Sequence, residues 1–322
     1  MKKILSLIFI STILLMISTQ SISAETNDNM VILGGEPFGI TMFSKGVIVI
    51  KTSSADNNLK PEDVIITADN ETVDSSEEME RIISESEDDT LELEIIRNEE
   101  CIFETARLFE DEQGIKRLGV WIKDSAAGLG TVTFYNPGNN TVCGLGHGIC
   151  ESDTGKLIPL SKGEIKSAYI TSVTKSENGN VGSLNGYFTE THIADALENR
   201  SEGIYGITES KVRGNSVIVA DESEINTGKA EIVTTIHGEI PKEYSAEIIK
   251  INPDNDTKNL VIRITDDELL SKTGGIVQGM SGSPIIQNGK LVGALTHVLI
   301  DSTDTGYGIF AERMLDISED AE

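Results

Sequence analysis

The sequence is poor in basic residues, which narrows the kinds of partner it can bind. Of its 322 residues only 26 are basic and 53 are acidic, so the formal net charge is −27. No basic patch offsets this charge, and the composition therefore argues against binding to nucleic acid phosphates. The acidic residues are spread among apolar segments, which is typical of the solvated surface of a folded protein.

Long apolar runs are also scarce, and the candidate that exists lies at the N-terminus. Lys2 and Lys3 precede an apolar run over residues 4–17, and small or polar residues follow as far as Ala24. This layout predicts a secretory signal over residues 1–24, with cleavage near Ala24. The run is short for a membrane span, although an uncleaved N-terminal anchor is the alternative. We therefore expect an exported, membrane-adjacent protein.

The chain has only three cysteines, Cys101, Cys143 and Cys150, and two of them flank His147. A disulfide beside the histidine, a metal site with Cys, His and Cys ligands, and two free thiols are the open interpretations. A structural zinc ion normally needs four ligands in recognisable pairs, and the sequence offers no second pair. We expect no metal and no cofactor.

Long amphipathic helices are scarce as well, whereas short β-type runs are frequent, so we expect a mainly β protein. In the C-terminal two thirds such runs are separated by Gly, Asn and Asp; they are residues 130–135, 216–220, 231–236, 245–251 and 260–264. This profile predicts an all-β sandwich or double barrel over residues 118–314. We expect the acidic tail, residues 315–322, to be frayed.

Residues 31–109 show short strands around one helix. Residues 46–51, 63–68 and 91–97 read as strands, and residues 77–84 place their apolar side chains on one helical face. The polar residues 110–117 are predicted to be a linker.

This order of elements resembles a PDZ domain. Phe38, Gly39 and Ile40 match the family's carboxylate-binding loop, and residues 58–65 match the segment that follows it, with Glu62 in place of the usual glycine. The resemblance implies that the backbone amides of this loop receive a peptide C-terminus, or a segment of the chain itself, through strand addition. A structural module without a ligand is the alternative.

The most informative motif lies in residues 274–298. The run Gly279-Met280-Ser281-Gly282 has the G-x-S-G layout of a serine peptidase nucleophile loop. The two glycines would let the backbone turn around Ser281 and aim the amides of Gly279 and Ser281 at an oxyanion. The Asn288-Gly289 turn then predicts a β-hairpin. An ordinary glycine-rich turn is the alternative interpretation.

A serine nucleophile needs a base, and the chain has four histidines. His147 lies in a glycine-flanked loop that can present an imidazole to a cleft. His297, with Thr296, follows the predicted hairpin; we expect this pair to line the substrate pocket, and His297 is the second choice as base. His192 and His237 fit surface and turn positions.

At this point the chain resembles the stage IV sporulation protein B peptidase family, a group of signalling serine peptidases from endospore-forming bacteria. The likeness covers the PDZ-like part, residues 121–130, the Gly146-His147 loop and residues 265–298. It implies a chymotrypsin-like double β-barrel with Ser281 as nucleophile, His147 as base and Asp266 as acid partner. Met280 replaces the aspartate with which trypsin-like enzymes bind a newly cut N-terminus, so that route of activation is absent.

The resemblance also implies a biological role. The peptidase would be exported from the forespore into the space between the two spore membranes. There it would cleave an extracytoplasmic regulator of a membrane metalloprotease, and also itself, in a pathway that activates a sigma factor. A catalytically silent PDZ and β-barrel scaffold is one alternative, and a general envelope quality-control protease is another.

Overall fold

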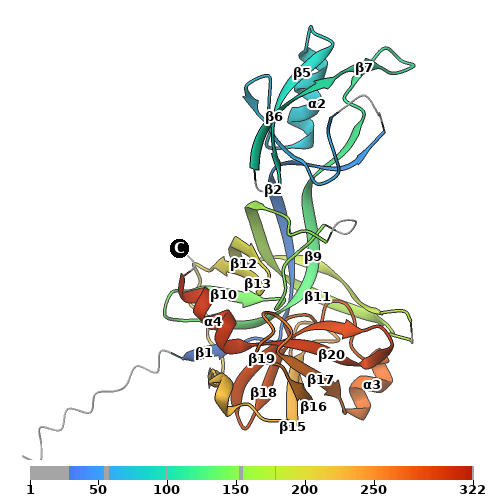
Figure 1. Cartoon of the computed structure of the whole chain (residues 1–322). Helices are drawn as coiled ribbons and strands as arrows, with labels where there is room; N and C mark the ends of the chain where they lie inside the picture. Colours follow the sequence, from blue (N-terminus) through green and yellow to red (C-terminus); the bar gives the residue numbers. More distant parts are fainter. Residues whose placement is uncertain (1–28, 54–57, 99, 152–154, 178, 321–322) are drawn as a thin grey trace, which may run out of the picture.

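The computed structural model describes residues 29–53, 58–98, 100–151, 155–177 and 179–320. It shows a mainly β protein with a PDZ-like part and a larger part built from two β-barrels, which confirms the predicted fold class. Two long strands, β2 (Pro37–Thr52) and β9 (Val120–Asn136), run from one part into the other (Figure 1). No helix in the described ranges has the length and apolar character that crossing a membrane requires. The predicted signal segment, residues 1–24, lies outside those ranges.

The PDZ-like part contains the predicted strands and helix. They lie in β2, β3 (Val64–Ala68), β5 (Thr90–Arg97) and α2 (Ser76–Glu85). The strands β4 (Glu71–Thr72) and β6 (Glu100–Arg107) complete this part and were not predicted. The hydroxyl of Ser75 caps α2 by accepting from Glu78 N, and Met79, Ile82 and Ile83 face the core as their spacing predicts.

The first barrel closes because β2 and β9 pair with each other along most of their length. Between them the sheet runs through β10 (Thr141–Gly144), β13 (Gly203–Ile207), β12 (Ser183–Arg200) and β11 (Leu160–Thr174). Strands β1 (Met30–Leu33) and β14 (Ser216–Ile218) extend this sheet beyond β9. The long β11–β12 hairpin was not predicted from the sequence.

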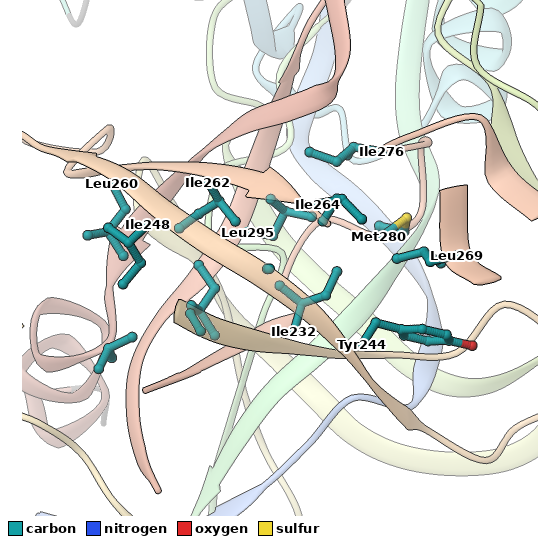
Figure 2. Packing of buried hydrophobic residues seen from close by; sticks show 14 of the residues in the cluster. Ile232, Tyr244, Ile248, Leu260, Ile262, Ile264, Leu269, Ile276, Met280 and Leu295 are labelled. Atoms are coloured by element: carbon teal, nitrogen blue, oxygen red, sulfur yellow. The ribbon is translucent and has the colours of Figure 1, made fainter. Parts of the chain in front are cut away.

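The second barrel closes through β15 (Gly228–Thr234), β16 (Lys242–Ile251), β17 (Leu260–Ile264), β20 (Ser302–Phe310), β19 (Lys290–Leu299) and β18 (Pro284–Gln287). The helical turn η1 (Glu222–Glu224) precedes it, and α3 (Asp267–Thr273) follows β17. Inward-facing apolar side chains, most of them aliphatic, fill its core (Figure 2). The predicted hairpin is present, with Asn288 and Gly289 both at positive φ, as a tight two-residue turn requires.

The strand pairings divide the chain differently from the predicted boundaries. Strand β1 and residues 37–43 of β2 pair with strands of the first barrel, although residues 31–109 were assigned to the PDZ-like domain. Conversely, Leu118 is buried in the PDZ-like core. The PDZ-like part is therefore an insertion between two strands of the first barrel, and not a domain that precedes the peptidase.

Two further predictions are corrected. Residues 110–117 are not a free linker: β7 (Phe109–Glu110) pairs with β8 (Lys116–Arg117), and Lys116 Nζ donates to carbonyls that follow α2. The acidic tail is helical as far as residue 320, in α4 (Ala311–Asp320). Met314 and Leu315 are buried in this helix, which the tail's many charges obscured.

Candidate active site

The nucleophile loop occupies residues 274–283, between α3 and β18. Gly279 and Gly282 adopt φ values of +97° and +93°, and a Cβ on Gly282 would lie 2.0 Å from Thr131 O, so only glycine fits there. Met280 is fully buried in the core of the second barrel (Figure 2). Apolar packing thus anchors this loop where trypsin-like enzymes use an aspartate, and Ser281 is left half-buried beside the cleft.

The peptide planes around Ser281 are fixed by their carbonyl groups. Gln278 O accepts from Leu184 N at 2.8 Å, and Met280 O accepts from Ser283 N at 3.0 Å. In a trans peptide the N–H points opposite to the C=O, so the amides of Gly279 and Ser281 point away from those partners. No acceptor within the described ranges takes either amide. This arrangement supports the predicted oxyanion role of both groups.

Strand β9 of the first barrel holds the nucleophile loop of the second. The hydroxyl of Thr131 donates to Gly279 O and that of Thr133 donates to Gly282 O, both at 2.8 Å, and both threonines are buried. Thr131 N also donates to Ser281 O. The sequence analysis missed these two threonines, although their i, i+2 spacing on a strand predicts that they share one face.

His147 follows β10 in a tight turn, in which Leu145 and Gly146 both have φ of +65°. Its Nδ1 lies 2.9 Å from Gly148 O. Because a carbonyl can only accept, Nδ1 carries the proton in the neutral ring and Nε2 is left as a base. Burial lowers the pKa of His147, and the bond to Gly148 O offsets this only in part. The base is therefore neutral at pH 7.

A second imidazole lies against the first. The rings of His147 and His297 have centroids 4.6 Å apart and planes tilted by 37°. Burial, with smaller contributions from His147 and Lys258, lowers the pKa of His297 to about 4. Both rings are consequently uncharged near neutral pH, which avoids repulsion between two cations in contact.

Asp266 does not lie where the predicted triad needs it. It is the N-cap of α3, and its carboxylate accepts from Leu269 N at 3.0 Å and from Ser245 N at 3.4 Å. Helix-capping chemistry explains an aspartate at this position. In the structure the proton on His147 Nδ1 is instead directed to a backbone carbonyl, so the prediction of Asp266 as the acid partner is not supported.

A cleft of about 860 Å³ between the two barrels brings together the other predicted site residues. His147, Ser281, Thr296 and His297 all line it, as expected, and no carboxylate lines it in the described part of the chain. The Ser281 hydroxyl donates to Thr296 O at 2.7 Å. The nucleophile therefore rests on a carbonyl of β19 and must turn to reach the imidazole.

The cysteines beside His147 are not bonded to each other. Cys143 is a buried free thiol, whereas Cys150 is exposed and lines the cleft. Asn199 holds the histidine loop in place of a disulfide: its Oδ1 accepts from Ile149 N, and its Nδ2 donates to Ile149 O and Ile158 O.

The predicted carboxylate-binding loop of the PDZ-like part is wrong. Phe38, Gly39 and Ile40 lie inside β2, where β9 pairs on one side and β11 on the other. Phe38 and Ile40 are buried in the first barrel. With both strand edges occupied, these backbone amides cannot receive a peptide C-terminus.

A groove of about 890 Å³ lies elsewhere in the PDZ-like part, between α2 and the start of β9. Leu118, Gly119 and Val120 border it and repeat the apolar-Gly-apolar pattern, with Gly119 at φ +75°. Gly119 O accepts from Ser53 N, so the neighbouring Val120 directs its own N–H and C=O away from β2. A peptide strand can therefore pair with Val120, beside Met79 and Ile83 of α2.

The fold and the cleft define a double-barrel serine peptidase with an inserted PDZ-like domain. A family model described as SpoIVB peptidase S55 matches residues 114–315, and the chain therefore belongs to this family. A PDZ domain model matches residues 22–102. No curated protein sequence matches the chain.

Several solved structures are similar to parts of the chain. The PDZ domain of an SdrC-like protein from Listeria monocytogenes is 20% identical, covers 24% of this chain and 87% of its own, and has a TM-score of 0.23. The inactive form of the Rv3671c protease has 16% identity, coverage of 60% and 84%, and a TM-score of 0.32. The HtrA-type protease AlgW with a decapeptide has 11% identity, coverage of 66% and 58%, and a TM-score of 0.35.

Proposed function

We propose that the protein is an exported signalling serine endopeptidase that cleaves an extracytoplasmic regulator of a membrane metalloprotease during sporulation, and also itself. It would act in the space between the two membranes around the forespore. It would be either released by cleavage of its N-terminal segment or anchored by that segment. Membership of the SpoIVB peptidase S55 family supports this role. The observation that carries the enzymatic part is one cleft lined by Ser281 and His147, with two unpaired amides at the serine.

The proposed reaction begins when the Ser281 hydroxyl leaves Thr296 O and turns to His147 Nε2. A substrate strand laid along Thr296 would offer its own N–H to that carbonyl and so release the hydroxyl. Ser281 Oγ then attacks the peptide carbonyl while its proton passes to Nε2. The amides of Gly279 and Ser281 stabilise the oxyanion. The imidazolium returns the proton to the leaving amine, and water hydrolyses the acyl-enzyme by the same route.

The lining of the cleft indicates the substrate residue that it accepts. The aliphatic side chains of Leu184, Ile276 and Val298 line the cleft together with Ser281. A charged substrate side chain would be buried there without a partner, at a cost of several kcal/mol. We therefore expect cleavage after an aliphatic residue such as leucine or valine.

Self-cleavage provides the first test of this function. The chain from Glu25 onward, as wild type and as Ser281→Ala, is followed over time by intact mass and by labelling with a fluorophosphonate. We expect self-cleavage and labelling in the wild type alone. Intact, unlabelled protein in both cases would favour a catalytically silent scaffold, and broad digestion of casein would favour a quality-control protease.

Peptide capture by the PDZ-like groove can be tested with the protein's own fluorescence. Trp121 is the single tryptophan of the sequence, is 68% exposed and lines the groove. We expect peptides with a free C-terminal carboxylate and an apolar last residue to change its emission. The same peptides with a C-terminal amide are the control. Equal responses to both forms would contradict carboxylate recognition at Leu118-Gly119-Val120.

A further inference from the structure

The tip of the β11–β12 hairpin leaves the first barrel and docks against the segment that leads to the nucleophile. Ser176, near the tip, is only 5% exposed. Its N–H donates to Thr273 O at 2.8 Å, and its hydroxyl donates to Ile276 O at 2.7 Å. Further along the tip, Gly179 N donates to Ile300 O. The hairpin tip is therefore packed against the second barrel and hydrogen-bonded to it, and is not a solvent-exposed turn.

The Ser176 hydroxyl also organises the returning strand of the same hairpin. It accepts from Gly182 N at 2.8 Å, so this one oxygen joins both arms of the tip to the nucleophile segment. Gly182 O in turn accepts from Gln278 N at 2.9 Å, and Gln278 O accepts from Leu184 N at 2.8 Å. The peptide groups on either side of Gln278 are thus both held by the hairpin.

We infer that Ser176 is a positioning residue for the oxyanion site of the proposed peptidase, on which this inference rests. The plane of the Gln278–Gly279 peptide determines where the Gly279 N–H points. Leu184 N holds that plane directly, Gly182 O holds the preceding Val277–Gln278 peptide, and the Ser176 hydroxyl holds Gly182 N. Ser176 touches no reacting atom; it acts by keeping one oxyanion donor in place before substrate arrives.

The inference predicts a selective kinetic loss. Without the hydroxyl, Ile276 O and Gly182 N both lose a buried partner, and Gly182 holds the peptide groups at Gln278 less firmly. Displacement of a catalytic group by about 1 Å costs about 100-fold, and loss of an oxyanion donor costs at least as much. We expect Ser176→Ala to lower kcat by about 10- to 100-fold and to change KM little, because the aliphatic walls of the cleft remain.

The test uses the chain from Glu25 onward and a fluorogenic peptide with leucine before the scissile bond. Ser176→Ala is compared with Ser176→Thr, which restores a hydroxyl, and with Ser172→Ala, an exposed serine of the same hairpin. A peptide boronate with the same leucine forms a tetrahedral adduct at the oxyanion site. We expect its inhibition constant to rise in Ser176→Ala by the factor by which kcat falls, and to recover in Ser176→Thr.

Several outcomes would overturn the inference. One is a rise in KM with unchanged kcat, and another is an equal loss in Ser172→Ala. Hydrogen exchange provides a readout that needs no turnover: the amide of Gln278 should exchange faster in Ser176→Ala than in wild type. Unchanged exchange would refute the positioning role even in an inactive protein. An inactive wild type with the expected exchange would refute the peptidase function alone.

Discussion

The pH dependence of the reaction follows from the way in which the structure holds His147. No carboxylate lines the cleft in the described ranges, and the Nδ1 proton is directed to Gly148 O. Burial holds the pKa of the imidazole below its ordinary value of about 6.5. The base must be neutral to accept the serine proton, so activity is retained down to that pKa and is lost as the pH falls through it.

A carboxylate partner and a carbonyl partner at His147 Nδ1 predict different midpoints for the acidic limb of kcat/KM, and this difference is large enough to measure. A carboxylate in contact with an imidazole stabilises the charged form and typically moves a pKa by about one to three units. With such a partner the acidic limb of kcat/KM would have its midpoint at about 7.5 or higher. With the carbonyl partner seen here we expect the midpoint below 6.5. The two cases thus differ by about one pH unit or more.

The assay is kcat/KM against pH, which reports the free enzyme, together with the pH dependence of fluorophosphonate labelling. Circular dichroism over the same range separates titration from acid unfolding. His192→Gln is a matched control, because His192 is exposed beside Glu164 and Asp195 and does not line the cleft. A midpoint at or above 7, unchanged in this control, would refute the reasoning. It would mean that a carboxylate approaches His147 in the active enzyme.

Three further predictions concern residues that hold the site and the fold. Thr131→Val leaves the buried Gly279 O without its donor. It should lower the free energy of unfolding by about 1–3 kcal/mol and slow fluorophosphonate labelling, whereas Thr131→Ser should keep the stability and the labelling rate of wild type. Equal losses in the two variants would implicate the methyl group instead. Asp266→Ala should cost about 1 kcal/mol in urea unfolding, because α3 loses its cap, and Asp266→Asn should cost clearly less. Arg97→Leu removes the bidentate partner of Asp63, which is 1% exposed. It should lower the free energy of unfolding by about 3–5 kcal/mol. A melting temperature equal to that of wild type would show that Asp63 finds another partner.

Local pattern was sufficient for the elements that carry their own signals. Apolar β-type runs located β17 and β5, the Asn288-Gly289 turn located the β18–β19 hairpin, and the apolar spacing of residues 77–84 located α2. Each of these elements is determined by residues that are neighbours in the sequence, so the local sequence is enough to predict it.

Long-range pairing was where local pattern failed. The role of Asp266 depends on which groups the fold brings to its carboxylate, and those proved to be the backbone amides of Leu269 and Ser245. The burial of Ser176 depends on a hairpin from one barrel reaching the other. Polar residues in a segment rich in Ser, Asn and Gly look like a surface turn unless that docking is known.

The carboxylate-binding loop shows the same limit most directly, because its local pattern occurs at more than one place in the sequence. Phe38-Gly39-Ile40 and Leu118-Gly119-Val120 both place glycine between apolar residues, and nothing local separates them. Which of the two segments can bind a peptide depends on the strands that pair with each of them. The first has β9 and β11 on its two edges, whereas the second meets β2 on one edge and faces α2 with the other. The same strand, β9, then continues from this open edge to Gly128 and Leu129 in the cleft and to Thr131 at the nucleophile loop. A peptide bound at Val120 would therefore rest on the strand that also holds the oxyanion site, which is a physical reason for the PDZ-like part to be inserted within the barrel.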